Sequence, residues 1–259
     1  MQARAQLVYR SDFLFGLGGL LLQIYLLKMV WTAVFPSSGA VAGEGGRSIT
    51  LATQIAYATL AGVQYWLFNP AMSSLIPDRI REGSVIVDLV RPVRFTAQAL
   101  FAQFGTTLAM APFAVCALPF AVLVGGMQSP ESTGVACVYA VSLALAYLVN
   151  TLLSVIVVMG AFWVIEIGGI YLIFRMVSQL LSGALVPLWF MPDWLAESVR
   201  FLPFHATTFT PISLYLGQAG GAGEMAAAIG VQVLWVVILW IALRIVWSRA
   251  LRRVVVQGG

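Results

Sequence analysis

The chain has few of the side chains on which most catalytic sites depend: its 259 residues include one histidine, one lysine and two cysteines. His205 is the only histidine, so an H-E-x-x-H zinc site cannot be formed. The only lysine, Lys28, follows Leu27, whereas the phosphate-binding sequence G-x-x-x-x-G-K-[ST] needs a glycine before its lysine. The sequence therefore excludes ATP hydrolysis through such a loop. The cysteines, Cys116 and Cys137, lie in or beside apolar stretches, and we expect both to be buried and unpaired.

Charge is also scarce. Only 9% of the residues are charged and 61% are hydrophobic, and the mean hydropathy is +0.94. A soluble domain has about 25% charged residues. Six apolar stretches each reach the roughly 20 residues that a helix needs to cross a bilayer. They are residues 13–35, 49–68, 95–124, 135–158, 163–187 and 225–247. The sequence predicts a single transmembrane domain over 1–259, an all-α integral membrane protein with about six spans.

The first stretch has features of a signal peptide, because "AVA" at 40–42 imitates a cleavage site. Its apolar core is longer than the roughly 7–15 residues of a signal sequence, so we expect it to be retained as a helix.

The basic residues predict the orientation, because lysine and arginine gather in short cytoplasmic segments. If the N-terminus lies inside, ten of the 14 basic residues are cytoplasmic, and only Arg47 and Arg200 are external. The cytoplasmic ten are Arg4, Arg10, Arg79, Arg81, Arg91, Arg94, Arg244, Arg249, Arg252 and Arg253. Both termini are then cytoplasmic. The pI near 9.3 reflects this topology and anionic lipid, and gives no evidence of nucleic-acid binding.

The connection between the second and third stretches contains the charged segment "NPAMSSLIPDRIREGSVIVDLVRPVRF", residues 69–95. After Pro70, apolar residues recur near helical spacing until Pro77 interrupts them. Two interpretations remain open: a solvated loop that holds positive charge inside, or a docking element (71–94) for a cytoplasmic partner. The candidate docking residues are Asp78, Arg79, Arg81, Glu82, Arg91 and Pro92.

A second unusual stretch is "LSGALVPLWFMPDWLAESVRFLPFHATTFTPISLYLG", residues 181–217, in which an apolar run breaks, becomes charged and turns apolar again. Together with "IREGSVIVDLVRPVRF", it resembles the permease subunits of type 2 ABC exporters. The resemblance covers nearly the whole chain. It implies short helices that re-enter the membrane after the fifth span, a second permease copy or paralogue, and separate ATPase subunits. ATP and Mg²⁺ would be bound by those subunits, and this chain would hold no cofactor.

The resemblance suggests an interpretation of the break. Pro187 and Pro192 would end the fifth span, and Asp193 would cap a short helix that Pro203 terminates. The predicted external lid, 188–206 with Pro187 before it, therefore depends on Pro187, Pro192, Asp193, Trp194 and Pro203. The alternative is a surface hairpin with interfacial aromatic residues.

Polar residues within apolar stretches are costly in lipid and are therefore candidates for a transport pathway. They are Lys28, Asn150, Glu166, Arg175 and Gln179. The alternative is structural polar packing between helices.

The sequence thus predicts the membrane subunit of an ATP-driven exporter in the cell membrane. ATPase subunits would push on 71–94 and on the turn near residues 159–162. Two alternatives are a membrane enzyme acting on lipid-linked substrates through Asp193, Glu197 and His205, and a sensory or immunity subunit that transports nothing. The substrate is open, and so is the choice between homodimer and heterodimer.

Overall fold

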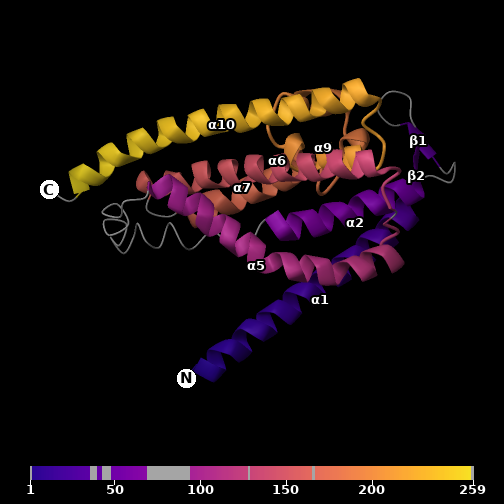
Figure 1. Cartoon of the computed structure of the whole chain (residues 1–259), viewed down its shortest axis with the longest axis horizontal. Helices are drawn as coiled ribbons and strands as arrows, with labels where there is room; N and C mark the ends of the chain where they lie inside the picture. Colours follow the sequence, from indigo (N-terminus) through magenta and orange to yellow (C-terminus); the bar gives the residue numbers. More distant parts are fainter. Residues whose placement is uncertain are drawn as a thin grey trace.

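Long helices make up most of the chain, which confirms the predicted all-α membrane-type fold (Figure 1). The structure is a computed structural model, and it describes residues 2–35, 40–42, 48–68, 94–127, 129–164 and 167–257. The long helices are α1 (Gln2–Val34), α2 (Leu51–Phe68), α5 (Phe95–Leu123), α6 (Thr133–Val158), α7 (Gly168–Leu181) and α10 (Ala222–Gln257).

Three segments of the described chain are long and apolar enough to cross a membrane: Phe15–Val34, Thr133–Phe162 and Ala222–Arg252. The total of about six spans stays a prediction. The expectation of a continuous fifth helix over 163–187 is wrong, because α7 has only 14 residues. At 1.5 Å per residue it is about 21 Å long, which is shorter than the roughly 30 Å of a bilayer core.

A small two-stranded ribbon precedes α2, an element that the sequence did not indicate. Strands β1 (Ala40–Ala42) and β2 (Ser48–Thr50) pair antiparallel, with Val41 opposite Ile49. The "AVA" that imitates a cleavage site is therefore β1. Ile49 is fully buried, so the ribbon is held against the helices by an apolar side chain.

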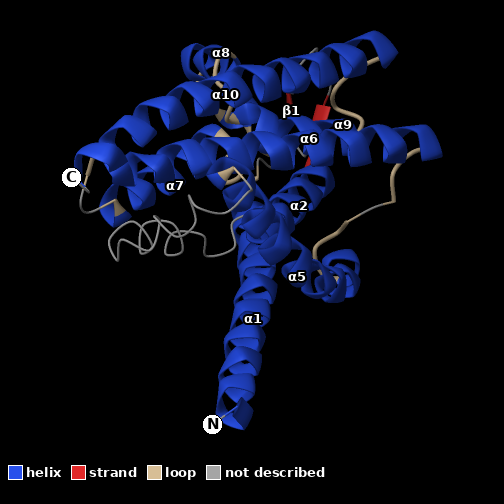
Figure 2. Ribbon diagram, turned by 60° about the vertical axis from the view of Figure 1, so that its left-hand side comes forward, coloured by secondary structure: helices blue, strands red, loops and turns tan. Residues whose placement is uncertain are grey.

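Helix α2 is the most enclosed of the long helices, and α1 and α5 cover one side of it. Leu20 and Ile24 of α1 pack with Ala117 of α5, and Val63 and Trp66 of α2 contact this cluster. The first half of α1 extends away from the other helices (Figure 2). Helix α5 contains Pro112 and Pro119 and bends along its length (Figure 1), as proline within a helix favours.

Helix α6 lies between α10 and α2, and the main apolar core lies along it (Figure 1). Val149 and Val155 of α6 pack against Leu239 and Leu243 of α10, and all four are buried. Ser132 begins α6, because its hydroxyl accepts a hydrogen bond of 3.2 Å from the Val135 N–H.

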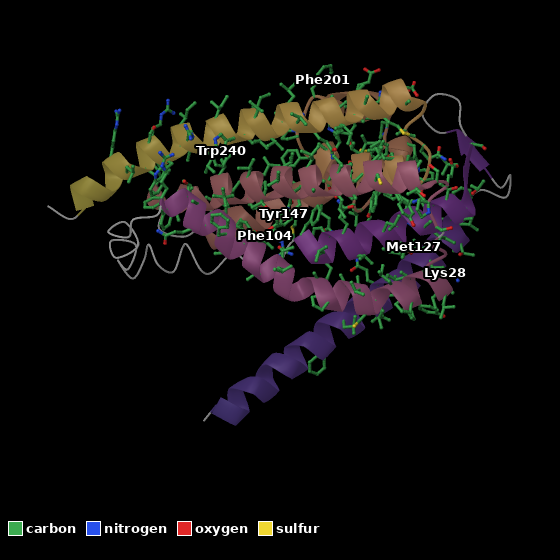
Figure 3. All side chains as sticks on the ribbon, viewed as in Figure 1. Lys28, Phe104, Met127, Tyr147, Phe201 and Trp240 are labelled. Carbon is green, nitrogen blue, oxygen red and sulfur yellow. The ribbon has the colours of Figure 1, made fainter. Side chains whose placement is uncertain are left out.

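The outer faces of the helices are apolar. Phe104 of α5 and Trp240 of α10 lie on the surface, as do many aliphatic side chains (Figure 3). Cys116 of α5 and Cys137 of α6 are free and exposed, so the expectation that they are buried is wrong. In a membrane protein an apolar neighbourhood does not indicate burial, because lipid tails cover the outer faces as well.

Candidate functional site

The fifth apolar stretch ends at a glycine, not at the predicted proline. Helix α7 stops at Leu181, and Gly183 follows in the left-handed region with φ +80°. The Leu185 N–H then bonds the carbonyl of Gln179. Glycine often ends helices in this way because it has no Cβ to clash. Pro187 lies six residues after Leu181, and the prediction that it ends this helix is wrong.

The chain between α7 and α10, residues 182–221, is called the α7–α10 connection below. It contains the turns η3 (Leu188–Phe190) and η4 (His205–Thr207) and the short helices α8 (Asp193–Arg200) and α9 (Phe209–Tyr215). The predicted short helix is therefore present as α8.

Helix α8 begins differently from the prediction. Pro192 is its N-cap and Asp193 is its first residue, and no side chain caps the helix, so the capping role of Asp193 is wrong. Its carboxylate still lies in the first turn, where the helix dipole favours negative charge. Val199 is fully buried against the bundle, whereas Trp194 is 70% exposed. Pro203 follows the end of the helix, where a proline is expected.

The second half of the connection returns into the bundle. All seven residues of α9 are buried, and α9 contacts both α2 and α6. The predicted boundary at residue 206 falls within η4, and the inserted part continues through Tyr215.

Buried amides hold this inserted part. Gln64 of α2 donates a hydrogen bond to the carbonyl of Thr207. Gln232 of α10 donates to the carbonyl of Ala206 at 2.8 Å, and its amide oxygen accepts from the Ser142 hydroxyl, also at 2.8 Å. Gln64 and Gln232 are 3% and 0% exposed. Turn η4 is thus held between two glutamines from helices on either side of it.

The first half of the connection is also attached to α2. The Tyr57 hydroxyl donates to the carbonyl of Gly183 at 2.9 Å, and Trp189 donates to the Gln54 side chain at 3.0 Å. The rings of Tyr57 and Trp189 meet edge to face, with centroids 4.8 Å apart. None of these α2 residues was singled out from the sequence. The signal was available, because Gln54 and Gln64 are polar residues in an apolar stretch.

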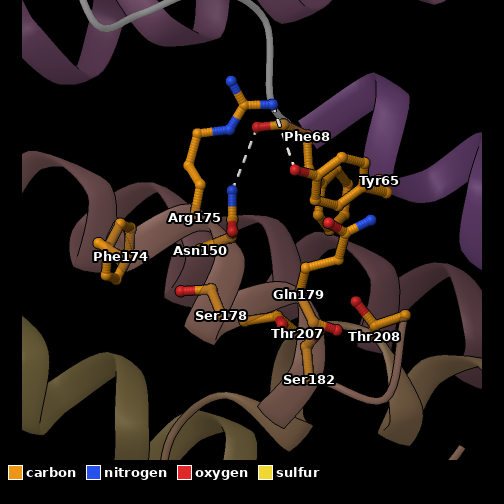
Figure 4. A pocket seen from close by; sticks show the side chains of 10 residues that line it. All are labelled: Tyr65, Phe68, Asn150, Phe174, Arg175, Ser178, Gln179, Ser182, Thr207 and Thr208. Carbon is orange, nitrogen blue, oxygen red and sulfur yellow. Dashed lines mark hydrogen bonds between the residues drawn. The ribbon is translucent and has the colours of Figure 1, made fainter. Parts of the chain in front are cut away.

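A polar cavity lies where α2, α6, α7 and η4 meet (Figure 4). It brings together three of the five predicted pathway residues, Asn150, Arg175 and Gln179. Their side chains point towards the last turn of α2 (Figure 4). The remaining residues that line the cavity are Tyr65, Phe68, Phe174, Ser178, Ser182, Thr207 and Thr208, which the sequence did not single out.

Two hydrogen bonds join the end of α2 to its neighbours in this cavity. Asn150 Nδ2 donates to the Phe68 carbonyl at 3.1 Å, and an Arg175 nitrogen donates to the Tyr65 hydroxyl at 3.2 Å. The Arg175 guanidinium also lies 5.9 Å from the centre of the Tyr65 ring. The last turn of α2 is therefore bonded to both α6 and α7.

The other predicted site residues lie elsewhere. Lys28 is on α1, towards the end of the bundle beside the β ribbon, and does not line the cavity (Figure 3). Glu166 lies outside the described residues, and so do Asp78, Arg79, Arg81, Glu82, Arg91 and Pro92.

The turn predicted near residues 159–162 is present as η2 (Met159–Phe162). The Phe162 ring lies edge to face with Phe95, the first residue of α5, with centroids 6.4 Å apart. Phe95 stacks on Trp247 of α10 at 5.0 Å. These three residues, called the aromatic cluster below, join the start of α5, the end of α6 and the last third of α10.

A wider hollow of about 390 Å³ lies between α8, α9 and α10, and Arg200, His205, Thr210 and Ser213 supply its polar lining. His205 is 9% exposed, and its Nδ1 donates to the Leu202 carbonyl at 2.7 Å. Asp193 and Glu197 are exposed on α8.

A family described as "ABC-2 family transporter protein" matches residues 21–258. The chain belongs to this family. No curated protein matches the sequence.

Membership in the ABC-2 family identifies the chain as a permease, the membrane subunit of an ABC transporter. Such subunits work with an ABC ATPase partner. The match begins within α1 and ends beyond α10, so it includes both the cavity and the α7–α10 connection.

Proposed function

We propose that this ABC-2 permease is the multi-pass subunit of an ATP-driven exporter in the cytoplasmic membrane, with both termini in the cytoplasm. Two copies, or one copy and a paralogue, form the translocation pathway. Separate ATPase subunits bind ATP and Mg²⁺ and dock on residues 71–94. The permease itself catalyses no reaction.

The observation that carries this proposal is the aromatic cluster. The predicted docking segment ends at Arg94, directly before Phe95, and the second predicted contact point is η2, which contains Phe162. The rings of Phe95 and Phe162 touch, and both contact Trp247. A push on either point is therefore transmitted to the same packed group, from which α5, α6 and α10 extend towards the other end of the bundle.

Helix α2 supplies a second connection. It ends at Phe68, three positions before the predicted docking segment begins at residue 71, and its residues Tyr57, Gln54 and Gln64 bind the α7–α10 connection. A displacement of α2 therefore moves the connection with it. Such a change is driven by ATP only if the ATPase binds nucleotide differently in the two states of the permease.

The test is reconstitution of the permease with the ATPase encoded by an adjacent gene. We expect the two to purify together, ATPase turnover to depend on the permease, and lipid vesicles to export cargo only with hydrolysable ATP. An ATPase whose catalytic glutamate is replaced by glutamine is the control.

The alternatives give different results in this assay. A sensory or immunity subunit binds the ATPase and changes its turnover without export. A lipid-modifying enzyme is active without the ATPase and loses activity on His205→Ala, whereas an exporter is inactive when purified alone.

A further inference from the structure

The polar cavity between α2, α6, α7 and η4 has the chemistry of an anion-binding site. Arg175 supplies a guanidinium group, and Gln179 and Ser178 supply an amide and a hydroxyl that donate hydrogen bonds. No acidic residue is among those that line the cavity in the described part of the chain. The lining therefore offers one positive charge and several donors.

The Arg175 guanidinium has more N–H donors than the described residues accept from. Its one side-chain hydrogen bond within the described chain is donated to the Tyr65 hydroxyl, which belongs to a phenol and not to a carboxylate. A guanidinium has five N–H donors in a fixed fork that matches a carboxylate or phosphate. None of the acidic side chains described by the structure forms a salt bridge with it. Arg175 is half-buried among apolar helices, where a positive charge without an acidic partner is costly, and an anion offsets that cost.

The Ser178 hydroxyl is a second polar group of the cavity. Its oxygen is buried and has no hydrogen-bond partner among the described residues. Several other buried side-chain atoms in the described chain share this property, so Ser178 supports the site through its place beside Arg175. The space in the cavity for the centres of water-sized atoms is about 20 Å³. This volume admits a single oxygen-sized group. The cavity therefore fits one oxygen of a head group and not a whole organic molecule.

Helix α7 presents opposite chemistry on its two sides. Arg175, Ser178, Gln179 and Ser182 recur at helical spacing and line the cavity. Ile173, Met176, Val177 and Leu180 recur at the same spacing and are exposed, Ile173 at 64% and Met176 at 63%. A molecule with an acidic head group and an apolar tail complements both sides of this helix.

We propose that the cavity receives one oxygen of the anionic head group of an amphiphile, a carboxylate or phosphate, and binds it through Arg175, Ser178 and Gln179. Within the proposed function, on which this part of the inference rests, the cargo of the exporter is an acidic amphiphile. The tail of this amphiphile lies along the exposed apolar face of α7.

The test measures thermal unfolding of the purified permease in a nonionic detergent, without the ATPase. Dodecyl phosphate, dodecanol and inorganic phosphate are added separately. We expect dodecyl phosphate to raise the unfolding temperature with a saturable dependence on concentration, because a ligand that binds only the folded state stabilises it. Dodecanol has the same tail without the charge and is expected to raise it much less.

Variants of the cavity residues test whether dodecyl phosphate binds in the cavity. Arg175→Gln is expected to weaken the apparent affinity at least about tenfold, because a charge-assisted hydrogen bond is lost. Ser178→Ala keeps the charge and is expected to weaken it less, and this variant also serves if Arg175→Gln does not fold. Arg249→Gln, an exposed arginine on α10, is the matched control and is expected to behave as wild type.

The results separate the outcomes. An equal shift in wild type, Arg175→Gln and Ser178→Ala shows surface attraction only and overturns the proposal, as does the absence of any shift. If inorganic phosphate alone raises the unfolding temperature and Arg175→Gln abolishes this rise, the cavity is an anion site. Its ligand is then a free anion and not the head group of an amphiphile. Because the ATPase is absent, failure here leaves the proposed export function standing, and failure of reconstitution leaves this site standing.

Discussion

The hydroxyl of Tyr57 donates a hydrogen bond of 2.9 Å to the carbonyl of Gly183, across 126 positions of sequence. It joins the middle of α2 to the residue that ends α7. A Cβ at Gly183 would lie 2.9 Å from the Tyr57 hydroxyl oxygen and 3.0 Å from Leu188 Cδ1. Position 183 therefore needs glycine for two reasons, its φ of +80° and the close approach of α2.

Gly183→Ala is therefore expected to lower the free energy of unfolding by about 1–3 kcal/mol, since a left-handed non-glycine residue is strained. The measurement is denaturant or thermal unfolding in detergent. Gly169→Ala is the control, because a Cβ there meets nothing within 4 Å on helix α7. A Gly183→Ala variant as stable as Gly169→Ala would contradict the geometry at position 183.

Pro187→Ala is expected to have a small effect on export, in contrast to Gly183→Ala. Helix α7 has already ended at Leu181, so removal of the proline ring does not lengthen it. The comparison is export at matched expression for the two variants. A severe loss in Pro187→Ala with wild-type export in Gly183→Ala would show that the proline controls the connection.

Gln232→Leu is expected to destabilise the fold and to loosen η4. It leaves the buried Ser142 hydroxyl and the Ala206 carbonyl without their partner, which costs about 1–3 kcal/mol. Protection of the backbone amides of 205–210 from hydrogen exchange is expected to fall more than that of α6. Ser142→Ala combined with Gln232→Leu is expected to cost less than the sum of the two single changes, because both remove the same bond. Additive losses would show that the bond contributes little.

Coupling depends on the aromatic cluster and on the charges of the docking segment. Phe162→Leu keeps an apolar side chain but removes ring contacts with Phe95 and Trp247. We expect ATPase assembly and turnover to persist while export falls several-fold. Phe101→Leu, at a position 71% exposed on α5, is the control.

Replacement of both Arg79 and Arg81 by glutamate is expected to weaken binding of the ATPase to the permease, which precedes the coupling step. If ATPase binding, ATP turnover and export all stay at wild-type levels, the segment 71–94 is only a solvated loop.

The predicted topology is tested by cysteine labelling from outside intact cells. The background is Cys116→Ala with Cys137→Ala, because both native thiols are exposed. Single cysteines at Gly46 and Gly221 are expected to react with an impermeant reagent, and one at Ser84 is not. Reaction at Ser84 alone would reverse the orientation.

The sequence by itself determined the class of the protein, because 9% charged residues and long apolar stretches are compatible with few environments other than lipid. It also located α8 by its charges and prolines, and η2 as a turn. The residues of 181–217 carried the resemblance that the family match confirms.

Only the tertiary structure decided which polar residues share a site. Asn150, Arg175 and Gln179 meet in one cavity and Lys28 does not, although all four appear in sequence as polar residues within apolar stretches. The fold also placed the glutamines of α2 and α10 on either side of η4, and ended α7 at Gly183 instead of Pro187. The physical reason is that lipid and protein interior are equally apolar, so hydrophobicity along the chain does not show which face of a helix meets which neighbour. That choice is made by side-chain packing and by the need of buried polar groups for partners, both of which join residues distant in sequence.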